Sequence, residues 1–239
     1  MKLDNKEMTV KSIEVYAKEY KDRFKSEDFM QPAENLIRPI KRQGLNKVMK
    51  DFNHALDFGC GDGRHTLYLS KLGYKVNSVD VDQSAIDATE KNIILNGDID
   101  KVTFDLISNS CELLHLKQKF KLIIAWEVLH WLGHKTDWVE TLATFYKILS
   151  KDGRVILTMP TENHFLLAKA QMNGDDEYLA TEKSREDCLF YAPNLDSLKN
   201  IFQSIGFKII EHSFFAHGNT KEDWSISNPF SMYVFTLSK

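Results

Sequence analysis

The sequence predicts an α/β protein built on a doubly wound, mostly parallel, seven-stranded sheet. Short apolar runs alternate with amphipathic segments from residue 54 to residue 159, a glycine-rich turn follows the first run, and an acidic residue ends the second. Alternating strands and helices imply right-handed crossovers, and such crossovers build a parallel sheet.

The first 53 residues are expected to form a helical cap. Apolar residues recur at helical spacing over residues 9–25, where Tyr16 and Tyr20 stand one turn apart. A second helical piece is expected after Pro32, kinked or short because Pro39 lies within it.

Residues 54–159 form the part of the chain in which predicted strands and helices alternate. Its apolar runs suit strands that are buried on both faces, and its helices begin and end at capping residues such as Ser84 and Gly73. The expected strands are 54–58, 75–80, 102–107, 121–125 and 153–159, and the expected helices are 66–72, 85–95 and 136–149.

The last part departs from this pattern. Residues 161–191 are polar, acidic and aromatic, and we expect an insertion after the fifth strand that acts as a lid or substrate segment. A capped helix over 194–205 precedes strands at 207–210 and 232–237. With no helix between them, these two strands predict an antiparallel pair at one sheet edge, so that the C-terminal strand is antiparallel.

The glycine turn is the most informative motif. Gly59, Gly61 and Gly63 lie between a strand and a helix, where they let the backbone approach a ligand without Cβ clashes. Asp80 ends the next strand, and ligands of open α/β sheets bind beyond the carboxyl ends of strands. A carboxylate there can accept hydrogen bonds from ribose hydroxyls, so the order of these features predicts a site for an adenosine-type ligand.

The composition of the chain argues against some classes of binding partner. The chain has 239 residues, a formal charge of -3 and a pI of about 6.2, with no basic stripe, so nucleic acid is disfavoured. Three separated cysteines, no signal-peptide pattern and no apolar run of about 20 residues predict a cytoplasmic protein that is not held in a membrane. The oligomeric state is left open.

The stretch from His54 to Met159 resembles class I S-adenosylmethionine (SAM)-dependent methyltransferases. Their first motif reads acid-x-Gly-x-Gly-x-Gly, which Asp57 and the three glycines match, with Cys60 inside the turn. Residues 120–125 followed by 126–132 resemble the family's fourth strand and the motif after it. The resemblance implies a Rossmann-like fold and SAM as cofactor. Residues 63–69 are also similar to tellurite-resistance-type methyltransferases, although that match is too short to indicate a substrate.

The resemblance also implies roles for single residues. Asp80 would hold the ribose and Val81 would flank the adenine, while either Asn109, favoured by spacing, or Asp105, favoured by residue type, would contact the adenine amine. The family places the acid of its first motif, here Asp57, near the methionine end of SAM. Further cofactor-binding candidates lie at the end of the fourth strand and on the helical cap: Ala125, Trp126, Tyr16 and Tyr20.

Charge favours SAM over a dinucleotide. The carboxylates of Asp57 and Asp62 would repel a diphosphate and attract a sulfonium and an ammonium, and Arg64 stands where a dinucleotide loop has its last glycine. Core packing or plain turn capping would explain several of the same residues.

The expected activity is methyl transfer to a small-molecule acceptor, a metabolite or sugar-like precursor, by in-line displacement. Positioning can supply most of the catalysis, and a base is needed only for a protonated acceptor. His130 and His164 are the candidate bases, with packed or loop histidines as the alternative. RNA or protein methylation and a non-catalytic SAM-binding regulator are the competing functions. No metal is expected, because Gly133 interrupts the His130–His134 spacing and no third ligand is evident.

Overall fold

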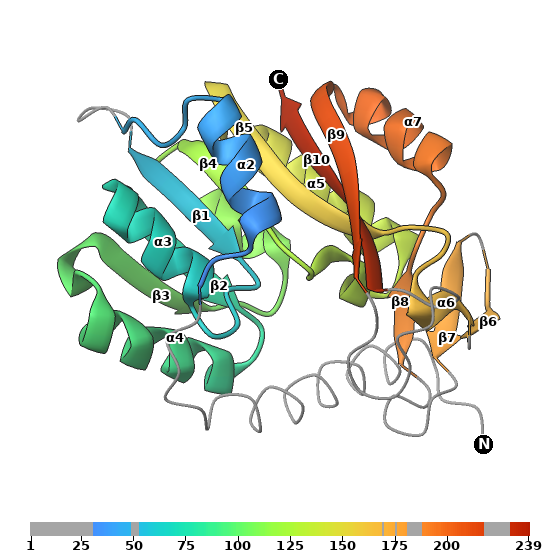
Figure 1. The fold of residues 1–239 in the computed structure, drawn as a ribbon, viewed down its shortest axis with the longest axis horizontal. Coiled ribbons are helices and arrows are strands. Elements are labelled where there is room, and N and C mark those ends of the chain that lie inside the picture. Colours follow the sequence, from blue (N-terminus) through green and yellow to red (C-terminus); the bar gives the residue numbers. More distant parts are fainter. Residues whose placement is uncertain (1–30, 49–52, 169, 175, 181–187, 218–229) are drawn as a thin grey trace.

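A seven-stranded sheet forms the centre of the computed structural model, with strand order β3-β2-β1-β4-β5-β10-β9 (Figure 1). The structure describes residues 31–48, 53–168, 170–174, 176–180, 188–217 and 230–239. β1 pairs in parallel with β2 and β4, and β10 runs antiparallel to both β5 and β9. The predicted fold class, including the antiparallel C-terminal strand, is confirmed.

The strands of this sheet follow the apolar runs of the sequence closely. Their bounds are β1 His54–Phe58, β2 Lys75–Asp80, β3 Val102–Leu106, β4 Phe120–Ala125, β5 Leu149–Pro160, β9 Lys208–His217 and β10 Phe230–Ser238. β5 and β9 are longer than expected. β5 begins at Leu149, which pairs with Phe120 of β4, and β9 extends to His217 because its pairing with β10 continues over polar residues that the apolar pattern leaves out.

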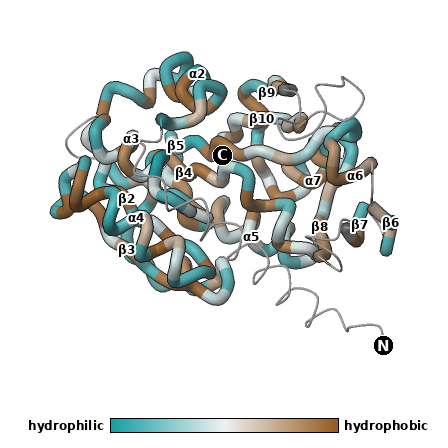
Figure 2. Tube along the Cα trace, turned by 60° about the horizontal axis from the view of Figure 1, so that its bottom comes forward, coloured by the Kyte–Doolittle hydropathy of each residue, from teal (hydrophilic) through white to brown (hydrophobic). Residues whose placement is uncertain are grey.

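Helices cover both faces of the sheet. On one face lie α2 (Glu34–Arg42), α3 (Arg64–Leu72) and α4 (Gln83–Asn96), and on the other lie α5 (Lys135–Ile148) and α7 (Leu195–Ile205). Each layer buries an apolar stripe, such as Leu36 and Ile40 of α2. Figure 2 shows brown and teal residues interspersed along the chain, including the helices that cover the sheet. No helix in these described parts of the chain is long and apolar enough to cross a membrane.

Several local expectations are corrected. Asp82, not Ser84, is the N-cap of α4, because its carboxylate accepts the Ser84 backbone N–H at 3.0 Å. After β4 the chain forms a short 3-10 turn, η3 (Leu129–Leu132), and Gly133 follows it at φ 80°. Pro39 lies inside the nine-residue α2, which is short as expected.

The segment after β5 has a regular structure of its own. It contains α6 (Phe165–Ala168) and a small antiparallel sheet of β6 (Ala170–Met172), β7 (Glu177–Ala180) and β8 (Leu189–Tyr191). Leu166, Cys188 and Phe190 form a separate apolar cluster there. The division of the chain at residue 53 remains a prediction. The expected helix over 9–25, with Tyr16 and Tyr20, lies outside the described residues.

Candidate functional site

The glycine turn lies at the carboxyl end of β1 and leads into α3. Gly59, Gly61 and Gly63 all have positive φ angles, of 74°, 57° and 80°. A Cβ on Gly59 would stand 2.4 Å from Cγ2 of Val128, and one on Gly63 would stand 2.9 Å from the Cα of Thr89. Only glycine satisfies both the backbone angle and the close approach, so the sequence motif is a geometric requirement.

Asp80 joins this turn to the end of β2. Its Oδ2 accepts the Gly61 backbone N–H at 3.1 Å, and its Oδ1 accepts those of Val81 and Asp82 at 2.8 and 3.1 Å. Burial raises the pKa of Asp80, and the three N–H donors act against that rise. A carboxylate has about four lone-pair sites, so roughly one remains on Oδ2 for a further donor.

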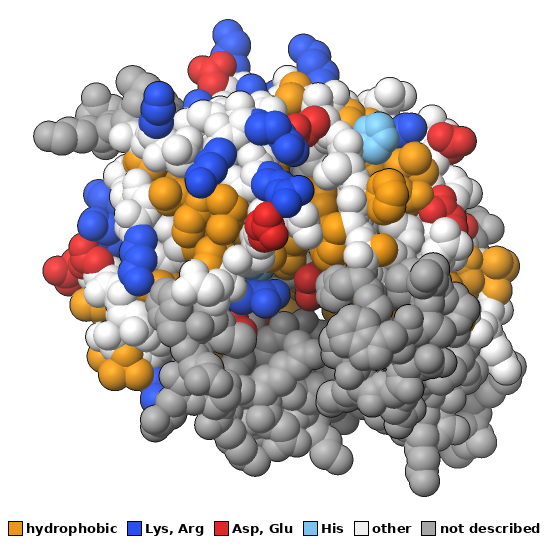
Figure 3. Space-filling model, viewed as in Figure 1, with side chains coloured by type: hydrophobic (Ala, Val, Ile, Leu, Met, Phe, Trp, Pro, Cys, Tyr) orange, Lys and Arg blue, Asp and Glu red, His pale blue; other side chains and the backbone are white. Residues whose placement is uncertain are grey.

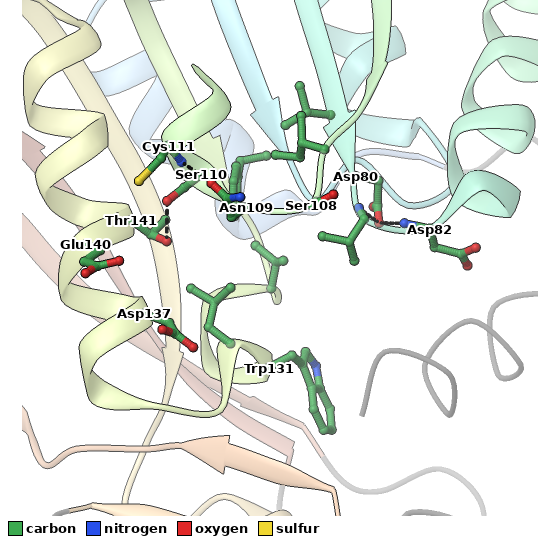
Figure 4. Close-up of a pocket in the computed structure, with 17 residues that line it drawn as sticks. Asp80, Asp82, Ser108, Asn109, Ser110, Cys111, Trp131, Asp137, Glu140 and Thr141 are labelled. Atoms are coloured by element: carbon green, nitrogen blue, oxygen red, sulfur yellow. Dashed lines mark hydrogen bonds between the residues drawn. The ribbon is translucent and has the colours of Figure 1, made fainter. Parts of the chain in front are cut away.

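A cavity of about 210 Å³ opens beside Asp80 (Figure 4). The residues that line it come from the ends of β1 and β2, from the segments that follow β1, β2, β3 and β4, and from α5. They are Phe58, Gly59, Val79, Asp80, Val81, Asp82, Ile107, Ser108, Asn109, Ser110, Cys111, Val128, Trp131, Leu132, Asp137, Glu140 and Thr141. Among these described residues the charged side chains are four carboxylates, with no Lys, Arg or His. The cavity therefore suits an apolar ring with hydroxyl or cationic groups and repels a diphosphate.

Two of the three residues predicted to contact the adenine line the cavity, and the third lies on the surface. Val81 lines the cavity and keeps 40% of its surface exposed, and the buried Ile107 lines it too. Asn109 also lines it, whereas Asp105 is an exposed residue of β3 outside the lining. The Asn109 side chain already accepts the Cys111 N–H at 3.0 Å in a capping box of the short turn η2 (Ser110–His115).

Asp57 and Cys60 are buried around the turn and do not line the cavity. Oδ2 of Asp57 accepts the hydroxyl of Thr66 at 2.7 Å, and burial raises the pKa of this carboxyl to about 7. Asp57 pairs with Ser78 in the sheet, so its side chain projects on the same face as that of Asp80, two residues further on. The Cys60 thiol accepts the Thr89 hydroxyl at 3.4 Å, and burial raises its pKa well above the usual value.

The residues at the end of β4 pack in the core. Ala125 is fully buried, and the indole of Trp126 stacks on Phe215 with ring centroids 6.0 Å apart and meets His65 edge-on. Neither lines the cavity. Glu127 follows with an uncommon φ of 57°, and its carboxylate accepts the Trp126 Nε1–H at 3.1 Å.

Both candidate bases are buried outside the cavity lining. His130 lies on η3 beside Trp131, and the two ring centroids are 4.9 Å apart. His164 packs between Phe165 and Phe230, and its Nδ1 accepts the Leu166 N–H at 3.2 Å. Their catalytic role remains a proposal.

Sequence reasoning missed the far wall of the cavity. Trp131, Asp137 and Glu140 lie opposite Asp80, on η3 and the first turns of α5 (Figure 4). Thr141, one turn beyond Asp137, hydrogen-bonds Ser110 at 3.0 Å and so fixes α5 against the turn after β3. The predicted contact at Asn109 indicated that residues 108–111 lie at the site. Nothing in the sequence indicated that α5 lines the cavity, because only tertiary packing brings it beside these residues.

A family model described as a methyltransferase domain matches residues 26–212. The chain belongs to the methyltransferase domain family. The predicted membership of the class I SAM-dependent methyltransferases is confirmed, and SAM is the cofactor of that family.

Individual matches agree with this family. A ribosomal protein L11 methyltransferase of Ruminiclostridium cellulolyticum is 43% identical over 60 residues, 25% of this chain and 19% of that protein. A ubiquinone biosynthesis O-methyltransferase of Pelagibacter ubique is 28% identical over 120 residues, 50% of this chain and 47% of that protein. The first curated matches cover only 19% to 28% of their relatives' length.

A solved structure shares the whole fold. The 1,6-didemethyltoxoflavin-N1-methyltransferase of Burkholderia thailandensis, solved with 1,6-didemethyltoxoflavin and S-adenosylhomocysteine, superposes with a TM-score of 0.66 at 17% identity. The match covers 100% of this chain and 92% of that one. At this identity the likeness concerns the fold.

The residues present fit SAM. Glycine at position 59 leaves room that a Cβ would fill, Oδ2 of Asp80 retains acceptor capacity, and the lining is apolar and acidic. Val81 and Ile107 give the cavity two apolar side chains, and Asp80 gives it a carboxylate.

Proposed function

We propose that this protein is a SAM-dependent methyltransferase acting on a small-molecule acceptor. The cavity at the end of β2 supports SAM as the cofactor, because it combines apolar walls with four carboxylates, one of which is Asp80. When bound, SAM supplies an electrophilic methyl group on a sulfonium. The protein's own task is then to hold donor and acceptor in line and to exclude water, a contribution worth up to about 7–11 kcal/mol.

The residues divide this task. Asp80 would accept a ribose hydroxyl, Val81 and Ile107 would hold the adenine, and Gly59 would let the backbone contact the ligand. His130 or His164 would act as base for an acceptor that must lose a proton. The buried positions of both histidines favour packing unless the acceptor reaches them.

The inserted segment supports a small acceptor. Trp131 lines the cavity, and its ring lies 6.4 Å from that of Phe190 on β8 in an edge-on contact. The small sheet therefore packs directly behind the cavity wall, where a short insertion can enclose a compact ligand. Small-molecule methyltransferases such as the toxoflavin enzyme share this fold over nearly their whole length.

A protein acceptor is the second candidate, favoured by the ribosomal protein L11 methyltransferase matches. Those matches cover under a third of the relatives, which leaves their remaining parts without a counterpart. A nucleic-acid acceptor is the third candidate, because a tRNA/tmRNA (uracil-C(5))-methyltransferase is among the curated relatives. Figure 3 shows Lys and Arg side chains interspersed with acidic and apolar ones on the described part of the face in view.

A labelled-methyl screen tests the proposal. The protein is incubated with methyl-labelled SAM and separately with a metabolite extract, ribosomal proteins and tRNA. Label in a small-molecule fraction supports the proposal. Label in protein or RNA supports the alternatives. SAM binding with no transfer to any pool would point to a regulator.

A further inference from the structure

The helix α5 begins without a side-chain cap from its own segment. Its first residue is Lys135, and the side chain of the preceding residue, His134, makes no capping hydrogen bond to the first turn. The first four N–H groups of a helix have no partner inside the helix, so they need acceptors from elsewhere. Here one acceptor comes from the inserted segment, from Glu177, the first residue of β7.

The Glu177 carboxylate contacts the start of α5 through both of its oxygens. Its Oε1 accepts the Lys135 backbone N–H at 3.0 Å, and its Oε2 lies 3.3 Å from Nδ1 of His134. The side chains of His134 and Glu177 are only 15% and 20% exposed, so solvent screens the contact less than it would on an open surface. A carboxylate at this position also interacts favourably with the helix dipole.

The backbone of Glu177 is fixed within the small sheet. It pairs with Tyr191 of β8, and its carbonyl accepts the Asn173 N–H at 2.8 Å. The same sheet also packs on the residue before the start of α5, because a Cβ on Gly133 would stand 3.4 Å from Cδ2 of Leu189 on β8. The inserted sheet and the start of α5 are therefore held together by a polar contact and an apolar one.

The helix that Glu177 caps forms one wall of the cavity. Asp137 lies in the first turn of α5, Glu140 follows about one turn later, and both line the cavity. Burial raises the pKa of Asp137, the nearby His134 opposes that rise, and the carboxylates of Glu140 and Glu177 add to it. A displaced helix start would therefore move two cavity carboxylates and change the charges around them.

We propose that Glu177 is a positioning residue through which the inserted sheet holds the α5 wall of the cavity in place. Glu177 itself is not among the lining residues, so it acts through α5. The inference rests on the proposed function, because the occupant of the cavity is taken to be the cofactor. By linkage, a ligand that requires this position of α5 also stabilises β7 and β8, and loss of the Glu177 contact weakens the ligand.

Two matched variants test the positioning role. Glu162 is the control residue, because its Oε1 accepts the Leu195 N–H at the start of α7 at 3.0 Å, and neither Glu162 nor α7 lines the cavity. Glu177→Ala and Glu162→Ala should both lower the melting temperature, since each removes an acceptor from a helix N-terminus. Isothermal titration should show S-adenosylhomocysteine binding at least about fivefold weaker in Glu177→Ala, and within about twofold of wild type in Glu162→Ala. Glu177→Gln keeps an oxygen for the Lys135 N–H and should recover part of the lost affinity.

Hydrogen exchange measures the coupling itself. In wild type, S-adenosylhomocysteine should slow exchange of the β7 and β8 amides more than that of the α7 amides. In Glu177→Ala saturated with ligand this difference should disappear, whereas a purely structural role would leave it in place. If Glu177→Ala does not fold, Glu177→Gln carries the same comparison with a smaller loss of affinity.

Two results would overturn the inference. One is wild-type affinity in a folded Glu177 variant, and the other is equal protection of β7, β8 and α7 in wild type. Failure of wild type to bind S-adenosylhomocysteine would instead overturn the proposed function.

Discussion

The backbone N–H of Gly61 donates to the buried carboxylate of Asp80, so the turn after β1 is fixed to the end of β2 by one hydrogen bond of 3.1 Å. The same carboxylate holds the N–H groups of Val81 and Asp82. Asp80 therefore has a structural role in addition to the ligand role proposed for it. The effect of a substitution at Asp80 must be measured both on the free energy of unfolding and on ligand affinity.

Asp80→Ala should lower both stability and ligand affinity. Three N–H groups lose a charged acceptor, and a cost of about 2–4 kcal/mol in the free energy of unfolding is expected. The thermal shift given by S-adenosylhomocysteine should disappear. Asp80→Asn keeps one oxygen as acceptor and should lose less stability. An Asp80→Ala protein that retains the full thermal shift would contradict the ribose role.

Gly59→Ala should destabilise the protein through a clash as well as through its backbone angle. Gly44 offers a matched control, since its φ of 67° is similar but a Cβ there meets nothing within 4 Å. Gly44→Ala is expected to cost about 1 kcal/mol, and Gly59→Ala about 1–3 kcal/mol more. Urea unfolding measures both, and equal costs would show that Val128 moves aside freely.

Asp57 should make stability fall as the pH rises. Burial raises its folded pKa to about 7 from the usual 3.8, so the folded protein retains a proton that the unfolded chain releases. The unfavourable contribution of Asp57 to the free energy of unfolding is absent below about pH 4, grows between about pH 4 and pH 7, and then levels off. Asp57→Asn should remove this slope. The stability advantage of Asp57→Asn over wild type should be larger at about pH 8 than at about pH 5, and parallel pH profiles would refute the assignment.

His164→Gln and His130→Gln should leave cofactor affinity within about twofold of wild type, because neither side chain lines the cavity. Both should lower the melting temperature, as each removes a buried ring from an aromatic contact. Once an acceptor is known, the pH dependence of kcat separates the roles. A lost acidic limb in one variant identifies the base, and an unchanged profile assigns both histidines to packing.

The sequence alone was sufficient for most of the sheet. Apolar runs and period-3.6 patterns depend on local neighbours, so strands such as β1 and β4 and the turn at Gly59 could be predicted. Bounds failed where pairing extends a strand beyond its apolar run, as in β9. The fold of the insertion also escaped prediction, because Phe190 and Leu166 become a core only when distant segments meet.

Side-chain directions set a second limit at the site. The motif acid Asp57 matched the family pattern, yet its carboxylate faces Thr66, and only the fold shows this. Trp126 and Trp131 are five residues apart with similar surroundings in sequence, but the first packs in the core and the second lines the cavity. Asp137 and Glu140 belong to the site only because α5 packs beside η2.

A crystal structure with S-adenosylhomocysteine tests the central claim most directly. We predict the ligand in the cavity at the end of β2, with a ribose hydroxyl within hydrogen-bonding distance of Asp80 and the adenine between Val81 and Ile107. A ligand bound elsewhere, or a cavity that takes NADH while S-adenosylhomocysteine at saturating concentration stays out, would contradict it.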